Sequence, residues 1–298
     1  MTHHPVLVQL NGIHQPDLVV QDSLSPGLQW RLQALQPFIH LAAQEFSRLG
    51  HGTCRFAVQL HDEDPAELAF RFDAPLVNDQ RGPLIPDPYA LGSKGFRDVR
   101  EDMVQKLPPW RERLPMAIWR GATTGRDELN TTTITTLPRY RLCQVSLQRP
   151  DLLDARLTNL VQTANATDHE RLNTQLLNQG LLRQRLSPHD LALHRWMVEI
   201  DGNVNSWGLL WKLLSGSCIL RVASARRQWY HHQLTAWKHM VPIRADLSDL
   251  EQKLQWCRSH LGESEQIAQQ GQQLALQVIK AMDKVQLAAV QAYAAECL

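Results

Sequence analysis

Residues 116–127 read Met116-Ala-Ile-Trp-Arg-Gly-Ala-Thr-Thr-Gly-Arg-Asp127, a short apolar segment that leads directly into glycine, threonine and arginine. A buried strand that ends in small polar residues is typical of a parallel α/β sheet. Further short apolar segments follow in the same half of the chain, with helical patterns between them. We therefore predict an α/β fold whose five strands lie at residues 116–119, 142–147, 196–200, 217–222 and 239–243.

The length of 298 residues exceeds what one hydrophobic core usually organises, so two lobes are expected. The pattern changes after Pro109, where mixed and proline-rich sequence gives way to alternating strands and helices. We place the first lobe at residues 1–109 and the second at 110–262. A C-terminal helix at 263–298 is expected to pack across the lobes.

Three helices and one more strand are predicted from local signals. Helical spacing over residues 29–48 precedes an apolar strand at 54–60, and a second helical stripe begins at 263. Ser248 and Glu251 have the spacing of a capping box, in which Ser248 accepts from the third helical amide and Glu251 reaches back. A helix is expected to follow and to run to about residue 260.

Composition excludes several classes of protein. The formal charge is +1, from 31 basic and 30 acidic side chains, so no basic field favours nucleic acid or an anionic membrane. Five cysteines occur singly, which indicates reduced thiols. There is no basic start with a sustained apolar run and no stretch of roughly 18 apolar residues, so a cytoplasmic protein without a transmembrane segment is expected. The pairs His3-His4 and His231-His232 lack partners at ligand spacing, so no metal site is predicted.

The loop after the first predicted strand of the second lobe, residues 119–127, contains groups suited to an anionic ligand. Its glycines permit close approach, Thr123 and Thr124 offer hydroxyl groups, and Arg120 and Arg126 carry charge that can neutralise phosphate. The alternative is an ordinary surface turn with flanking arginines.

A second loop, residues 200–208, lies between a predicted strand and a predicted helix at 209–214. A loop that enters a helix N-terminus presents unpaired N–H groups and the positive end of the helix dipole to a diphosphate. The alternative is that Asn205 or Ser206 merely caps the helix. Two such loops on neighbouring parallel strands would face the same crevice, because ligands of open α/β folds bind at the carboxyl ends of the strands.

Both loops belong to a longer series of motifs. Residues 119–127 resemble the aromatic-Arg-Gly-Ser-x-Thr motif, with its following Arg-Asp, of the Rumi-type protein O-glucosyltransferases, glycosyltransferase family 90. Residues 194–250 are similar to the most recognisable block of that family, and the match runs in order over residues 56–274. The elements of that block are Ile200-Asp201-Gly202, Ser206-Trp207, Leu213-Leu214-Ser215-Gly216-Ser217, Trp229-Tyr230, Leu234, Trp237, His239, Val241-Pro242 and Asp246-Leu247-Ser248-Asp249-Leu250.

The resemblance implies a GT-B-like architecture of two Rossmann-like lobes with a cleft between them. It implies transfer of a sugar, glucose or xylose, from a UDP-sugar to a hydroxyl of a glycan or protein, with inversion and without a divalent metal. The UDP-sugar is then a co-substrate, and no cofactor is expected. The first lobe would lie on the acceptor side, the second would bind the donor nucleotide, and lipopolysaccharide or capsule polymers are among the implied acceptors.

On the acceptor side, the resemblance places the general base at Asp62, the match to an aspartate at the end of an early strand. A carboxylate there can take the proton of a hydroxyl that attacks the sugar. Glu63 and Asp64 are close enough to be alternatives. The apolar loop at residues 84–89 is the candidate acceptor wall, with Tyr89 in it and Asp87 as a second candidate base.

On the donor side, arginine forks and loop amides can stabilise the charge that develops on a leaving UDP. The residues that the resemblance assigns to donor binding are Arg126, Asn203, Val204, Asn205, Ser206 and Trp207, with Arg120, Gly121, Thr123 and Thr124 in the adjoining motif.

The sequence departs from the family pattern at two positions. Ala122 stands where much of the family has serine, and Gly208 stands where many members have an arginine shortly after the Ser-aromatic pair. Our hypothesis is that a cation from elsewhere compensates, the candidates being Arg195, Lys212 and Arg221.

Other functions stay open. The departures are compatible with a GT-B transferase of different donor specificity, or with a degenerate protein that binds a nucleotide sugar or glycan without turnover. A dehydrogenase is the remaining α/β possibility, but no G-x-G-x-x-G motif follows any predicted strand. Four tryptophans could include a stacking platform for a base or sugar, although core packing explains most of them; they are Trp207, Trp211, Trp229 and Trp237.

Overall fold

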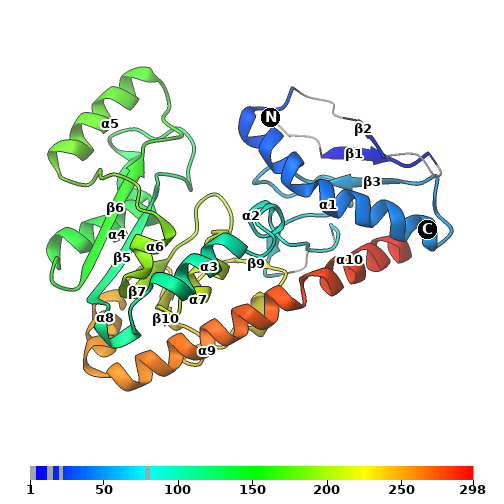
Figure 1. Cartoon of the computed structure of the whole chain (residues 1–298). Coiled ribbons are helices and arrows are strands. Elements are labelled where there is room, and N and C mark those ends of the chain that lie inside the picture. The colour runs from blue at the N-terminus through cyan, green and yellow to red at the C-terminus, as the bar shows by residue number, and fades with distance from the viewer. Residues whose placement is uncertain (1–4, 12–15, 20–22, 78–80, 298) are drawn as a thin grey trace. The chain divides into compact units, whose positions relative to one another are not determined.

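The computed structural model describes residues 5–11, 16–19, 23–77 and 81–297. The chain divides into two compact units (Figure 1). Unit 1 consists of Met1–Arg97, Ala225–His232 and Gln277–Leu298, and unit 2 consists of Asp98–Ser224 and Gln233–Leu276. Each unit is therefore built from segments that are far apart in the sequence.

Unit 2 is an α/β unit around a five-stranded parallel sheet, which confirms the predicted fold class. Its strands are β5 (Leu114–Ala122), β6 (Leu153–Asn159), β7 (His194–Glu199), β8 (Cys218–Val222) and β10 (Val241–Ile243). Their spatial order is β10-β8-β7-β5-β6. Counted along the chain from the other edge, this is the order 2-1-3-4-5 of a doubly wound Rossmann-like sheet, in which the order reverses between β5 and β7.

Helices cover the sheet of unit 2. Helix α4 packs on β6, α7 packs on β8, and α8 packs on β10. The helical segments are α3 (Arg97–Lys106), η1 (Trp110–Glu112), η2 (Thr133–Thr136), α4 (Pro138–Gln148), α5 (Ala166–Asn178), α6 (Pro188–Ala192), α7 (Leu209–Leu214), α8 (Leu250–Ser259) and α9 (Leu261–Lys280). The short helix η3 (His231–Gln233) has its first two residues in unit 1 and its last in unit 2. One continuous apolar core lies beneath the helices, and Cys143, Cys218 and Cys257 are buried thiols within it.

The strand predicted at residues 142–147 is wrong, because these residues belong to α4. Pro138 occupies the first turn of α4, where its fixed φ favours a helix start, and Tyr140, Leu142, Cys143 and Ser146 are buried along it. The sheet position is taken by β6, whose buried residues alternate with partly exposed ones. That two-residue period was the signal for the strand.

The predicted capping box at Ser248 is also wrong. Helix α8 begins at Leu250 with Asp249 as its N-cap, and no side chain caps it. Leu247 has a left-handed φ of 64°, and the Asp249 carboxylate accepts from the Arg244 amide at 2.9 Å instead. Because of this turn, α8 begins too late for Ser248 to be its N-cap. The helix ends at Ser259, close to the predicted end.

Unit 1 combines two small sheets with helices from both ends of the chain. Strands β2 (Asp17–Val19), β1 (Val6–Gln9) and β3 (Arg55–Val58) form an antiparallel sheet in that order, and β4 (Asp73–Pro75) pairs with β9 (Arg226–Gln228). Its helices are α1 (Pro26–Arg48), α2 (Pro88–Gly92) and α10 (Met282–Cys297). The predicted helix and strand at 29–48 and 54–60 are thus confirmed as α1 and β3.

Helix α10 joins the core of unit 1. The Tyr293 ring stacks on Phe70 with ring centroids 4.6 Å apart, and its hydroxyl donates to the Leu68 carbonyl oxygen at 3.2 Å. The predicted C-terminal helical stripe is divided at Ala281 into α9 and α10, and the last residues of α9 group with unit 1. Among the described helices, none has the length and apolar character needed to cross a membrane.

Candidate functional site

The two polar loops predicted as a ligand site are joined across the reversal point of the unit 2 sheet. One follows β5 and the other follows β7, which are neighbouring strands. The Gly125 amide donates to the Asn203 side-chain oxygen, Oδ1, at 2.9 Å. Open α/β sheets bind their ligands at this point, because loops from adjacent strands diverge to opposite faces there. The prediction that the loops share one edge of the sheet is therefore confirmed.

An arginine that the sequence did not reveal holds these loops together. Arg139, on α4, is half-buried and donates to the carbonyl oxygens of Ala122 at 3.0 Å and of Asp201 at 2.8 Å. It also donates to the Thr124 hydroxyl at 2.5 Å and the Ile200 carbonyl at 3.2 Å. The burial lowers the pKa of its guanidinium from the usual value, opposed mainly by the nearby Glu199 and Asp201 carboxylates. One planar fork thus bridges the ends of β5 and β7.

Glycine is required where these loops approach each other. A Cβ atom at Gly202 would lie 2.4 Å from the Thr124 Oγ1 and 2.9 Å from an Arg139 guanidinium nitrogen. At Gly121 a Cβ would lie 2.5 Å from the Trp119 ring, and Gly125 has a φ of +127°. A side chain at Gly202 would therefore displace Thr124 and Arg139, whereas one at Gly121 would displace the Trp119 ring of the same strand.

Two predicted donor-binding residues in the first loop have structural partners. Arg120 pairs with Asp154 at 2.5 Å, and its side chain is largely buried. Thr123 is fully buried; its hydroxyl donates to the Val161 carbonyl oxygen at 2.9 Å and accepts from the Val161 amide at 2.8 Å. We infer that both residues shape the loop, whereas Arg126 is exposed and donates to the Thr136 hydroxyl at 3.1 Å.

The second loop is organised by Asp201. Its carboxylate accepts from the Asn205 side-chain amide at 3.3 Å and from the Ser206 backbone amide at 3.3 Å. Asn205 is buried and also donates to the Ser224 hydroxyl at 2.9 Å, while Asn203 is exposed. The other predicted members of this loop are Val204, which is buried, and Trp207, which is partly exposed.

The alternative in which Asn205 or Ser206 caps the following helix is wrong. The N-cap of α7 is Gly208, and no side chain makes a capping hydrogen bond there. The Ser206 hydroxyl accepts from the Gly208 amide at 3.3 Å, which lies outside the helix. The second loop therefore keeps its own internal hydrogen bonds, and its conformation is not that of a simple cap.

The three cations considered as replacements for an arginine at position 208 lie in different places. Lys212 is buried and pairs with Glu199 at 2.5 Å. Arg195 is at the beginning of β7, with its guanidinium 5.6 Å from the centre of the Trp110 ring. Arg221 lies one residue before the carboxyl end of β8 and in register with Glu199. Arg221 therefore lies near the carboxyl ends of the strands, where the two loops are. Arg195 lies near the amino end of β7, away from the loops.

The acidic turn of unit 1 gives its three carboxylates different surroundings. The Asp62 Oδ1 accepts from Arg31 at 2.8 Å, and 26% of the Asp62 side chain is exposed. Glu63 is exposed. Asp64 binds Arg226 at 2.6 Å, and Arg226 also binds Asp73 at 2.5 Å. Asp64 thus ties the β9 segment into unit 1. The Asp62 and Asp64 side chains are similarly exposed, at 26% and 22%, so the pairing partner and not the exposure distinguishes them.

The second candidate base, Asp87, is buried at the start of α2. Its Oδ1 accepts from the amides of Tyr89 at 3.0 Å and Ala90 at 3.1 Å, which makes it the N-cap of this helix. Its Oδ2 has no hydrogen-bond partner among the described residues. Burial raises the pKa of Asp87 to about 7. Tyr89, the predicted wall residue, is 48% exposed and its ring contacts Trp30, with centroids 4.6 Å apart.

The raised pKa of Asp87 predicts a pH-dependent contribution to stability. Between the usual aspartate pKa of 3.8 and a folded-state pKa of about 7, the native state binds a proton that the unfolded state releases. This contribution is complete at low pH and is lost as the pH rises through about 7. The difference in unfolding free energy between wild type and Asp87→Asn should fall by about 1–3 kcal/mol from pH 5 to pH 8 in urea titrations. A difference that is constant with pH would contradict this.

Fold and loops together define an α/β protein with a candidate ligand site at the reversal point of a Rossmann-like sheet. The model of the family described as "Glycosyl transferase family 90" matches residues 91–294. This match covers both loops and most of the chain, so the chain belongs to glycosyl transferase family 90.

Individual relatives match over part of their length. Uncharacterized protein 035R of Invertebrate iridescent virus 3 is 34% identical over 160 residues, which cover 52% of this chain and 14% of the viral protein. Protein O-glucosyltransferase 2 of Danio rerio is 28% identical over 168 residues, 56% of this chain and 30% of the relative. The chain thus spans less than a third of the length of these relatives. The structure of Anabaena Alr3699/HepE in complex with UDP-glucose is similar with a TM-score of 0.41 and 12% identity, covering 65% of this chain and 51% of the other.

Proposed function

We propose that the chain transfers a sugar, glucose or xylose, from a UDP-sugar to a hydroxyl group of a glycan or protein. The observation that carries this proposal is the union of the two loops at the reversal point of the sheet, through the Gly125 to Asn203 hydrogen bond and the Arg139 fork. Family membership supports it, as does the name of a relative, Protein O-glucosyltransferase 2. The donor on unit 2 and the acceptor on unit 1 are part of the proposal.

In the proposed reaction, Asp62 takes the proton of the acceptor hydroxyl while its oxygen attacks the anomeric carbon of the sugar. The bond between that carbon and the UDP oxygen breaks on the opposite face, so the configuration inverts. The exposed Arg126 guanidinium and the loop amides stabilise the charge that develops on the leaving diphosphate. The described residues contain no group of three or more His, Cys, Asp or Glu that could hold a metal ion.

Binding of the donor tests the site directly. Replacing Arg126 with alanine should weaken UDP-glucose affinity about tenfold in calorimetry, because one charge-assisted contact to the diphosphate is lost. The matched control is Arg258→Ala, which removes an exposed arginine of α8. Equal affinities of wild type and Arg126→Ala, in a protein that binds UDP-glucose, would remove Arg126 from the donor site. If no UDP-sugar raised the melting temperature of the wild type, the donor assignment itself would fail.

A second candidate function is the binding of a nucleotide sugar without turnover. It is favoured by the packing at Gly208, where a Cβ atom would lie 3.2 Å from the Trp211 indole nitrogen and 3.3 Å from the Ser206 hydroxyl. The family arginine is absent here, and a side chain at this position would require the Trp211 and Ser206 side chains to shift by about a few tenths of an ångström. Slow release of glucose from UDP-glucose by the purified protein would identify an enzyme, and binding without any release or transfer would identify a binding protein.

The cellular location and the acceptor stay predictions. The cytoplasmic location expected from the sequence is tested by fractionation of the producing cells. An acceptor in lipopolysaccharide or capsule assembly is tested by supplying those glycans with labelled donor and measuring incorporation.

A further inference from the structure

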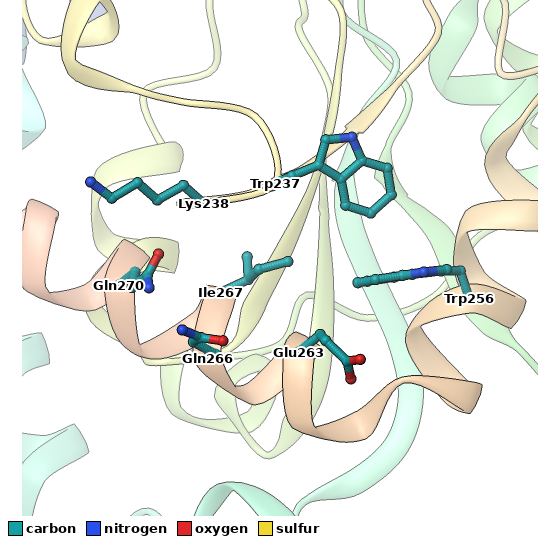
Figure 2. A pocket seen from close by; sticks show the side chains of 7 residues that line it. All are labelled: Trp237, Lys238, Trp256, Glu263, Gln266, Ile267 and Gln270. Carbon is teal, nitrogen blue, oxygen red and sulfur yellow. The ribbon is translucent and has the colours of Figure 1, made fainter.

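A pocket of about 420 Å³ lies in unit 2 near the amino ends of the sheet strands, whereas the donor loops lie at their carboxyl ends. Its lining comes from the segment before β10, from α8 and from the first half of α9 (Figure 2). Because β10 is parallel to the other strands, the segment that precedes it lies at the amino edge of the sheet. The residues of the pocket are Trp237, Lys238, Trp256, Glu263, Gln266, Ile267 and Gln270.

The most unusual residue of this pocket is Trp237. Its side chain is 43% exposed, and its backbone has a left-handed φ of 63°. A bulky residue rarely adopts this conformation, which costs about 1–3 kcal/mol and is found mainly at functional sites. From the sequence, Trp237 could be either a core residue or part of a stacking platform. Its exposure excludes a core position.

Neighbouring side chains hold both indoles in place. Trp237 and Trp256 pack edge to face, with ring centroids 4.8 Å apart. The Lys253 ammonium lies 4.5 Å from the centre of the Trp237 ring, and His260 stacks on Trp256 at 4.8 Å. In Figure 2 the Trp237 ring is seen face-on and Trp256 edge-on, and Ile267 lies between the indoles and the Gln266 and Gln270 side chains. The aromatic surface is therefore partly exposed and is packed against neighbouring side chains.

The polar lining has no net charge. Lys238 and Glu263 have opposite charges, and Gln266 and Gln270 are neutral amides that both donate and accept hydrogen bonds. The Glu263 carboxylate would repel a phosphate. A cation could not bind the face of Trp237 next to Lys253 or the face of Trp256 on which His260 stacks. A neutral ligand with many hydroxyl groups fits this combination best.

We propose that the Trp237 pocket is an accessory site for a neutral saccharide unit, separate from the donor site. The C–H face of a pyranose ring would lie against the indoles, and its hydroxyls would bind the glutamine amides. The volume falls within the range of roughly 300–1,000 Å³ typical of small-molecule sites. Such a site would hold a glycan on unit 2 whether or not the protein transfers a sugar. The proposal therefore does not rest on the proposed reaction.

The test is binding of neutral oligosaccharides in the absence of any nucleotide. Wild-type protein is titrated with maltopentaose, cellopentaose and xylopentaose, with saturation-transfer NMR and calorimetry as the readouts. Trp237→Gly deletes the indole and relieves the left-handed backbone, so loss of folding does not explain its result. We expect Trp237→Gly to weaken binding at least about tenfold and Gln266→Ala to weaken it several-fold.

The control is Leu177→Ala, which removes an exposed apolar side chain from α5 in the same unit and should leave binding unchanged. The proposal is overturned if none of the three pentasaccharides binds at millimolar concentration, or if Trp237→Gly binds as tightly as wild type. Competition of the pentasaccharides by UDP-glucose, together with loss of binding in Arg126→Ala, would place the saccharide in the donor site instead.

Discussion

Replacing Asp62 with asparagine is expected to lower the rate of sugar transfer by about 100-fold to 10,000-fold, the usual contribution of a general base. Asparagine keeps the shape of the side chain and a hydrogen-bond acceptor for Arg31, but it cannot take the proton of the attacking hydroxyl. The Arg31 to Asp62 pair is partly exposed, so its loss should change stability by no more than about 1 kcal/mol. Initial rates of transfer and UDP-glucose calorimetry on the same preparation separate chemistry from binding.

Glu63→Gln and Asp87→Asn are the matched comparisons, because each also replaces a carboxylate by its amide. Glu63 is exposed beside Asp62, whereas Asp87 is buried as the N-cap of α2. We expect this loss of rate in Asp62→Asn with unchanged donor affinity, while the other two variants keep most of the rate. Loss of transfer in Glu63→Gln alone would identify Glu63 as the general base. Full activity of Asp62→Asn would show that Asp62 is not the general base.

The second large effect is expected at Arg139. Alanine there would leave the four oxygens at the ends of β5 and β7 without their shared donor. Since a partly buried acceptor without a partner is costly, the free energy of unfolding should fall by about 2–4 kcal/mol. The loops would no longer be held together, so UDP-glucose affinity should fall at least about tenfold.

Arg139→Lys distinguishes charge from geometry. Lysine keeps the charge but has no planar fork, so it should restore little of the affinity. Arg141→Ala is the control, because Arg141 lies on the same helix, is exposed and donates to the Thr135 carbonyl oxygen, away from the two loops. Urea unfolding and calorimetry measure both quantities. Wild-type stability and affinity in Arg139→Ala would show that the fork does not position the loops.

Local sequence patterns determined four of the five strands of unit 2. Strands β5, β7, β8 and β10 and helix α7 were predicted from short apolar runs, because burial in a parallel sheet requires such runs whatever the rest of the chain does. The pattern failed over residues 142–147, where apolar residues at helical spacing resemble a strand when the window is short. It missed β6, in which buried residues alternate with partly exposed ones and no continuous apolar run occurs.

The sequence by itself determined the two loops, their glycines and the family of the chain, since these depend on residue types at fixed spacing along one segment. Only the tertiary structure decided which side chains hold the loops and which are accessible. Arg139 lies 62 residues from Asp201, and Arg226 lies 162 residues from Asp64. Nothing local relates such residues, because their contacts form only when packing of the core brings distant segments together. The same reason explains why an exposed Trp237 beside Trp256 became visible only in the folded chain.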